Sequence, residues 1–135
     1  MDLLTETLRA ALRANAETGA RATRDPVPVV KFFNPCGAAT WLATELDADG
    51  DTLFGLADLG FGCPELGSFS LSEIASVRLP LGLRIERDLH FSTTYRLSTW
   101  AECARRAGSI LWAETLLRRA AAQGGTELPD PDKAG

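Results

Sequence analysis

The sequence has few of the residues that build metal, redox or nucleic-acid sites. Of its 135 residues, one is histidine and three are cysteine. The cysteine count is odd and no Cys-x-x-Cys occurs, which excludes a zinc ribbon and a disulfide framework. Acidic residues outnumber basic ones by 18 to 14, and the net charge of −4 argues against a nucleic-acid coat with a basic stripe. We therefore expect reduced thiols and a cytoplasmic location.

Long apolar runs are missing too. No stretch approaches the ~20 apolar residues of a membrane span. The start, Met-Asp-Leu-Leu-Thr-Glu, lacks the cationic and apolar regions of a signal peptide, so we expect no membrane association. With 45% hydrophobic and 24% charged residues, the composition is that of a globular domain.

The hydrophobic pattern predicts the order helix, three strands, short helix, strand and two helices. The helices are expected at about residues 2–16, 71–77, 99–107 and 110–122, with Ser70–Glu73 and Thr99–Glu102 capping boxes opening the second and third. The strands are expected at about 27–33, 38–46, 52–58 and 84–91, and an irregular glycine-rich loop at 59–69.

Antiparallel hairpins with segregated helices favour the α+β class, here a small antiparallel sheet of about four strands. The expected organisation has three parts. They are an N-terminal helix and linker at 1–26, a single α+β domain at 27–108, and a C-terminal helical extension with a frayed tail at 109–135.

Several ordered segments resemble one family. They are Phe33-Asn-Pro-Cys-Gly-Ala-Ala-Thr-Trp-Leu-Ala-Thr-Glu45, Leu53-Phe-Gly-Leu-Ala-Asp-Leu-Gly60, Pro64-Glu-Leu-Gly67, Ser70-Leu-Ser-Glu73 and Ile85-Glu-Arg-Asp-Leu-His-Phe91. Over about residues 27–108 the chain is similar to the domain of unknown function 2958 family of bacteria, their plasmids and integrated elements. The resemblance implies a small single-domain protein encoded near conjugation, anti-restriction and DNA-handling genes. Some members carry the label of single-stranded DNA endonuclease.

The strand expected at 84–91 holds the sharpest candidate for chemistry. Its period of two places Glu86, Asp88 and His90 on one face. With Asp58 and Glu65 from the ends of the glycine-rich loop, these acids form a candidate site for magnesium or manganese, which would activate water for phosphodiester cleavage. The alternative is a solvated polar face on a half-buried strand. The family often has a large aromatic residue at position 90, so a role for His90 would not extend to the family.

Arg87 and the glycine-rich loop supply the candidate ligand-binding residues. Arg87 falls among apolar residues on the inward face, where we expect an ion pair with Glu65 or Glu73; a phosphate or carboxylate clamp is the alternative. The loop displays Phe61 and Leu66 beside Glu65, as mobile binding loops do, whereas its glycines are explained by sharp turns.

Three other patterns have a structural and a functional interpretation. Asp47, Asp49 and Asp51 resemble the start of a calcium loop, but a hairpin turn fits better. Cys63 or Cys103 could form a Cys–His nucleophile with His90, but we favour inert thiols that pack as small residues. The tryptophans would serve as base-stacking platforms or, as we favour for Trp41 and Trp100, as core residues.

Two functions follow. The first is an accessory interaction protein without a cofactor, linked to mobile or integrated elements, which binds a protein partner or a DNA-processing complex. The alternative is a magnesium- or manganese-dependent endonuclease that acts on single-stranded DNA.

Overall fold

The computed structural model describes residues 2–19 and 24–124. The elements in chain order are α1 (Glu6–Glu17), β1 (Val30–Phe33), β2 (Thr40–Leu46), β3 (Thr52–Asp58), β4 (Glu65–Ser70), α3 (Leu71–Ser76), the 3₁₀ turn η1 (Pro80–Gly82), β5 (Glu86–Arg87), α4 (Leu97–Ala107) and α5 (Ile110–Ala122). The five strands form one antiparallel sheet in the order β4-β3-β2-β1-β5. The α+β class is confirmed, with five strands where about four were expected.

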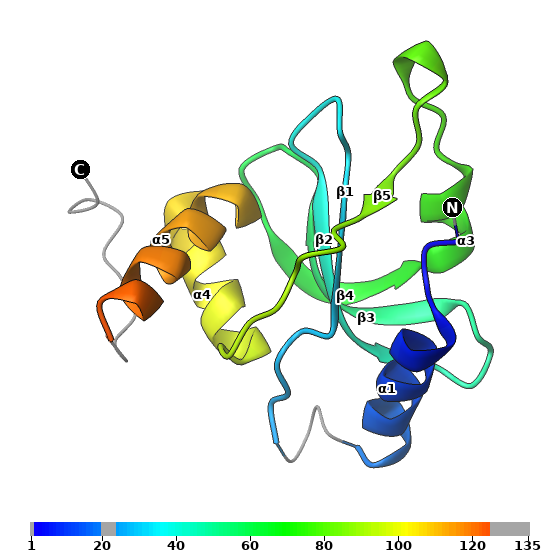
Figure 1. The fold of residues 1–135 in the computed structure, drawn as a ribbon, viewed down its shortest axis with the longest axis horizontal. Helices are drawn as coiled ribbons and strands as arrows, with labels where there is room; N and C mark the ends of the chain where they lie inside the picture. The colour runs from blue at the N-terminus through cyan, green and yellow to red at the C-terminus, as the bar shows by residue number, and fades with distance from the viewer. Residues whose placement is uncertain (1, 20–23, 125–135) are drawn as a thin grey trace.

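Helices cover both faces of the sheet, α1 on one and the α4–α5 pair on the other (Figure 1). The central strand β2 is therefore buried along its whole length, and its side chains alternate between two cores. Trp41 joins Phe32 and Leu53 in the core that α1 covers, whereas Leu42 and Trp100 belong to the core under α4 and α5. Trp41 and Trp100 are thus core residues, as expected.

Helix α1 is tied to the sheet where β2 has a bulge. The pairing of β2 with β3 shifts register between Ala43 and Glu45, which takes the Thr44 carbonyl out of the regular ladder. The Asn15 side chain donates to that carbonyl at 2.9 Å, and Arg13 Nη1 donates to the Leu46 carbonyl at 2.6 Å. These bonds fix the helix over the β2–β3 hairpin.

Three local predictions were wrong. Residues 65–70 form β4 and not loop, because they pair with β3 along their whole length despite Gly67. The strand expected at 84–91 contains only Glu86 and Arg87, since a turn follows at residues 89–90. The N-cap of α4 is Arg96, without a side-chain bond, and not Thr99.

Other expectations are confirmed by hydrogen bonds. Ser70 caps α3 by accepting from the Glu73 amide at 3.2 Å. Asp49 accepts from the amides of Asp51 and Thr52, both at 2.8 Å, which makes residues 47–51 a hairpin turn. Residues 20–23 of the linker expected at 20–25, and residues 125–135 of the expected frayed tail, lie outside the described residues.

Candidate functional site

The four acids expected to share a metal ion are not brought together. Glu65 begins β4 at one edge of the sheet, whereas Glu86 and Asp88 lie in and directly after β5 at the other. Strands β3, β2 and β1 separate them. In residues 2–19 and 24–124, no group of three or more His, Cys, Asp or Glu is arranged to hold a metal ion. The predicted convergence was wrong because it depended on sheet order, which local periodicity does not encode.

Asp58, the remaining predicted ligand, is fully buried and has a structural role. Its Oδ1 accepts from the Gly60 amide at 2.8 Å, and its Oδ2 accepts from the Ile110 amide at 2.9 Å. The first bond shapes the turn after β3, and the second satisfies an amide at the start of α5 that has no partner within the helix. Both carboxylate oxygens are used by the backbone.

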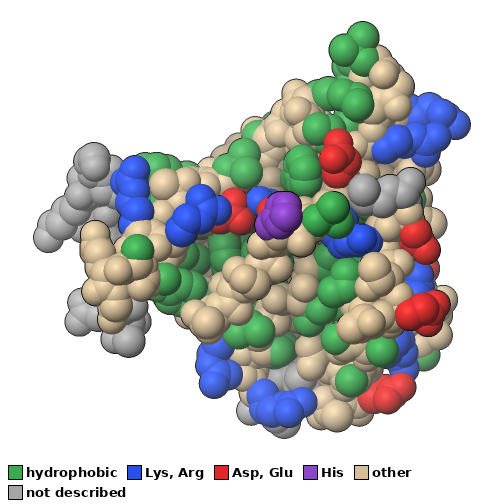
Figure 2. Space-filling model, in the orientation of Figure 1, with side chains coloured by type: hydrophobic (Ala, Val, Ile, Leu, Met, Phe, Trp, Pro, Cys, Tyr) green, Lys and Arg blue, Asp and Glu red, His purple; other side chains and the backbone are tan. Residues whose placement is uncertain are grey.

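At the β5 edge, the three residues predicted to share one face of a strand do lie around one pocket. Glu86, Asp88 and His90 line one pocket of about 360 Å³, together with Lys31 and Leu111. The Asp88 Oδ1 accepts from the His90 amide at 2.9 Å, which makes the turn that ends the strand. Figure 2 shows the chain's one histidine on the surface, with acidic and basic side chains close beside it.

The sequence analysis did not identify Lys31, a buried lysine that lines this pocket. The Lys31 side chain is only 8% exposed, and its Nζ lies 2.9 and 3.1 Å from the two carboxylate oxygens of Glu114 and 3.4 Å from Asp88 Oδ2. The triad joins β1, the end of β5 and α5. Its signal in the sequence was a lysine within the apolar stretch Val29-Val-Lys-Phe-Phe33. Because Asp88 is already paired with an ammonium group, it is not a free metal ligand.

Arg87 has a different partner from those expected. It lies opposite Phe32 in the β1–β5 pairing, on the α1 side of the sheet. Its Nη1 donates to the carbonyl of Asp2 at 2.9 Å, and neither Glu65 nor Glu73 receives it. The bond ties the N-terminal segment to the sheet edge, so the predicted ion pair is corrected to a bond with the backbone.

Of the other predicted ligand-binding residues, Glu65 and Leu66 lie at the start of the edge strand β4, and Phe61 lies on the loop that leads into it. We name the β4 surface as the outer edge of β4 with Leu59, Phe61, Glu65 and Leu66. The three apolar side chains are 59%, 83% and 49% exposed, in chain order. Glu65 and Leu66 also line a hollow of about 560 Å³ that reaches Arg105 on α4. The positive φ of Gly60 and Gly62 confirms sharp turns in the loop that carries Phe61.

In the part of the chain that the structure describes, no hydrogen bond joins a cysteine thiol to His90, and the Cys63 thiol donates to the carbonyl of Phe61 at 3.8 Å. All three cysteines are free, with Cys36 and Cys63 exposed and Cys103 in the core beneath α4. Burial raises the pKa of the Cys103 thiol, which keeps it in the unreactive protonated form.

The family model described as "Protein of unknown function (DUF2958)" matches residues 3–111. The chain belongs to the DUF2958 family. The family region includes α1 as well as the sheet and α4, so it begins earlier than the resemblance at 27–108 indicated. No curated protein and no solved structure matches the chain. Within the part of the chain that the structure describes, no helix has the length and apolar character needed to cross a membrane.

Proposed function

We propose that this DUF2958 member is a protein-interaction module that binds an extended segment of its partner along the β4 surface. The observation that carries the proposal is Phe61, a large apolar side chain that is 83% exposed on the loop that leads into the edge strand β4. Leu59 on the same loop and Leu66 on β4 are also exposed, and exposed apolar surface on a small domain commonly marks an interaction site.

The edge itself favours a strand-like partner. Among the residues that the structure describes, β4 pairs with β3 and with no other strand, and its outer side presents backbone N–H and C=O groups for pairing. Edge strands are usually protected by lysine, proline or a bulge, and the sequence Glu65-Leu-Gly-Ser-Phe-Ser70 has no lysine or proline. A partner strand would gain main-chain hydrogen bonds here, while Leu66 and Phe61 supply apolar contacts.

The proposed partner belongs to a DNA-processing complex of a mobile or integrated element, and the binding takes place in the cytoplasm. Two features support this part of the proposal. The resemblance noted in the sequence implies relatives encoded near DNA-handling and anti-restriction genes. The net charge of −4 also suits approach to a protein with a basic nucleic-acid groove, by charge complementarity.

The test is quantitative co-purification from a host that carries the element. Phe61→Ser combined with Leu66→Ser should lower recovery of the partner about tenfold, since contacts at the centre of an interface dominate affinity. Leu81→Ser is the matched control, because Leu81 is 96% exposed but lies on the turn that projects between α3 and β5 (Figure 1). Equal recovery by the double variant and the control would contradict the proposal.

The nuclease alternative is separated by a second arm of the experiment. The purified protein should leave labelled single-stranded DNA intact with magnesium or manganese, because the predicted ligands lie at opposite edges of the sheet. Metal-dependent cleavage that disappears in Asp88→Asn would overturn the interaction proposal in favour of the nuclease.

A further inference from the structure

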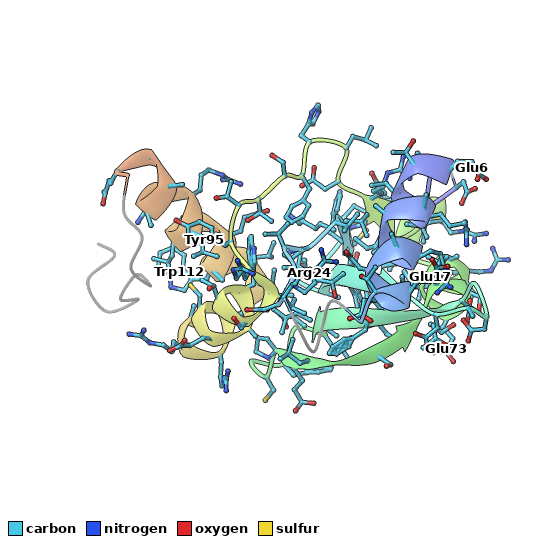
Figure 3. All side chains as sticks on the ribbon, turned by 90° about the horizontal axis from the view of Figure 1, so that it is seen from below. Glu6, Glu17, Arg24, Glu73, Tyr95 and Trp112 are labelled. Carbon is cyan, nitrogen blue, oxygen red and sulfur yellow. The ribbon has the colours of Figure 1, made fainter. Side chains whose placement is uncertain are left out.

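A hollow of about 300 Å³ lies between α5, the start of α4 and the segment that connects β5 to α4. It shares no lining residue with the β4 surface or with the pocket that Glu86, Asp88 and His90 line. Figure 3 shows Tyr95, one of its lining residues, close to α5 at the end of the molecule opposite α1. We call it the aromatic pocket, and its lining consists of Phe91, Ser92, Thr93, Thr94, Tyr95, Trp100, Glu114, Leu117, Arg118 and Ala121.

Three of the walls are aromatic. Phe91 and Trp100 lie in contact, with ring centroids 6.1 Å apart and planes tilted by 50°, and Tyr95 adds a third ring to the lining. Leu117 of α5 contributes an apolar wall. Aromatic and aliphatic walls of this kind accommodate a planar ring better than a charged chain, because they replace its contact with water by dispersion contacts.

Thr93 presents a hydrogen-bond donor to this space. Its Oγ1 accepts from the Tyr95 amide and from Trp100 Nε1, both at 3.1 Å. A threonine hydroxyl has two acceptor positions and one proton, so only the donor function is left. That proton has no acceptor among the residues that the structure describes. The hydroxyl is therefore suited to an oxygen of a bound molecule.

Arg118 gives the pocket its charge. Its side chain is 73% exposed, and its Nη2 lies 3.6 Å from Glu114 Oε1. Glu114 is already paired with Lys31 at 2.9 Å, so its charge is shared between two cations. The guanidinium fork of Arg118 remains suited to a carboxylate or phosphate, which it binds through two parallel hydrogen bonds.

From these contacts we infer that the aromatic pocket binds a small aromatic ring carrying an anionic carboxylate or phosphate. The ring lies against Phe91, Tyr95 and Trp100. The anionic group accepts from Thr93 Oγ1 and from the Arg118 guanidinium. This site goes beyond the proposed protein interaction, because no residue of the β4 surface takes part in it.

The experiment is an amide and indole NMR titration of the full chain with phenylacetate, phenyl phosphate and neutral phenylacetamide. The anions should cause a saturable shift of the Trp100 Nε1–H signal, with an affinity about tenfold above that of phenylacetamide. The Trp41 signal, from the core that α1 covers, is the internal control. A preference for one anion over the other tells which of the two groups the site takes.

A matched pair of variants tests the role of the cation. Arg118→Gln should raise the dissociation constant of the preferred anion about tenfold, whereas Arg78→Gln, at an exposed position after α3, should leave it unchanged. The inference is wrong if neither anion gives a saturable shift, if phenylacetamide binds equally well, or if both variants weaken binding alike. None of these outcomes depends on the β4 surface, so this experiment and the co-purification experiment test the two proposals independently.

Discussion

Among single residues, Gly55 carries the strictest steric requirement in the sheet. A Cβ atom built there would lie 1.8 Å from the carbonyl oxygen of Leu42 on the neighbouring strand. That contact involves backbone on both sides, so it is not relieved by turning a side chain. A glycine inside an expected strand is the sequence signal for such a close approach.

We expect Gly55→Ala to lower the free energy of unfolding by about 3 kcal/mol, since β2 and β3 would have to move apart at the centre of the sheet. Urea denaturation measures the change. Gly67→Ala in β4 is the control, because a Cβ there meets nothing within 4 Å, and it should change stability by less than about 0.5 kcal/mol. Equal effects of the two substitutions would refute the steric account.

A second prediction at the residue scale concerns Asp49 and pH. Hydrogen bonds from the Thr52 hydroxyl, the Thr52 amide and the Asp51 amide lower the pKa of Asp49 from 3.8 to about 2. Folding thus favours the ionised form, and its contribution to stability is complete above about pH 4 and disappears as the pH falls through 2.

The carboxyl carbon of Asp49 should titrate by NMR with a midpoint near pH 2 in the folded protein. Between pH 4 and 2, the stability of the wild type should also fall more steeply than that of Asp49→Asn. A midpoint near 3.8 would show that the turn does not favour the carboxylate.

At the scale of elements, Asp58 connects the end of β3 to the start of α5. We expect Asp58→Ala to cost about 2–3 kcal/mol and to speed amide exchange at Ile110, because two amides lose a charged, buried acceptor. Ser109→Ala, which removes only the N-cap bond to the Trp112 amide, should cost about 1 kcal/mol. Unchanged stability in Asp58→Ala without added metal would point back to a ligand role.

Elements with strong periodicity were predictable from the sequence, and those that depend on a neighbour were not. The apolar stripes of α1 and α5 and the hairpin of β2 and β3 show in the sequence, since each is determined by residues close in the chain. The six residues of β4 contain a glycine and three polar positions, and they are extended because β3 pairs with them. For β5, alternation continued to residue 91, but the Asp88 side chain turns the chain at His90.

The candidate site also has one part that the sequence predicted and one part that it did not. That Glu86 and Asp88 share a pocket follows from a period of two, and the sequence predicted it. That Asp88 pairs with Lys31, and that Lys31 pairs with Glu114, depends on packing between residues up to 83 positions apart. No local pattern contains that information.

The molecule as a whole has two helix-covered faces and edges of unequal length. β5 has two residues and its edge is short, whereas the six-residue β4 combines an open edge with exposed Phe61 and Leu66. The β4 edge therefore has the length and the exposed apolar side chains to bind a partner strand, whereas the β5 edge is too short. The proposed interaction predicts that binding affects the β4 end and leaves the Lys31 triad at the other end unchanged.

Hydrogen exchange of the protein with and without its co-purified partner tests this claim most directly. The account predicts slowed exchange in residues 59–70, because pairing with a partner strand protects the outward amides of β4. Exchange around Asp88 and Glu114 should not change. Protection confined to the β5 edge, with residues 59–70 exchanging at the rate of the free protein, would contradict the account.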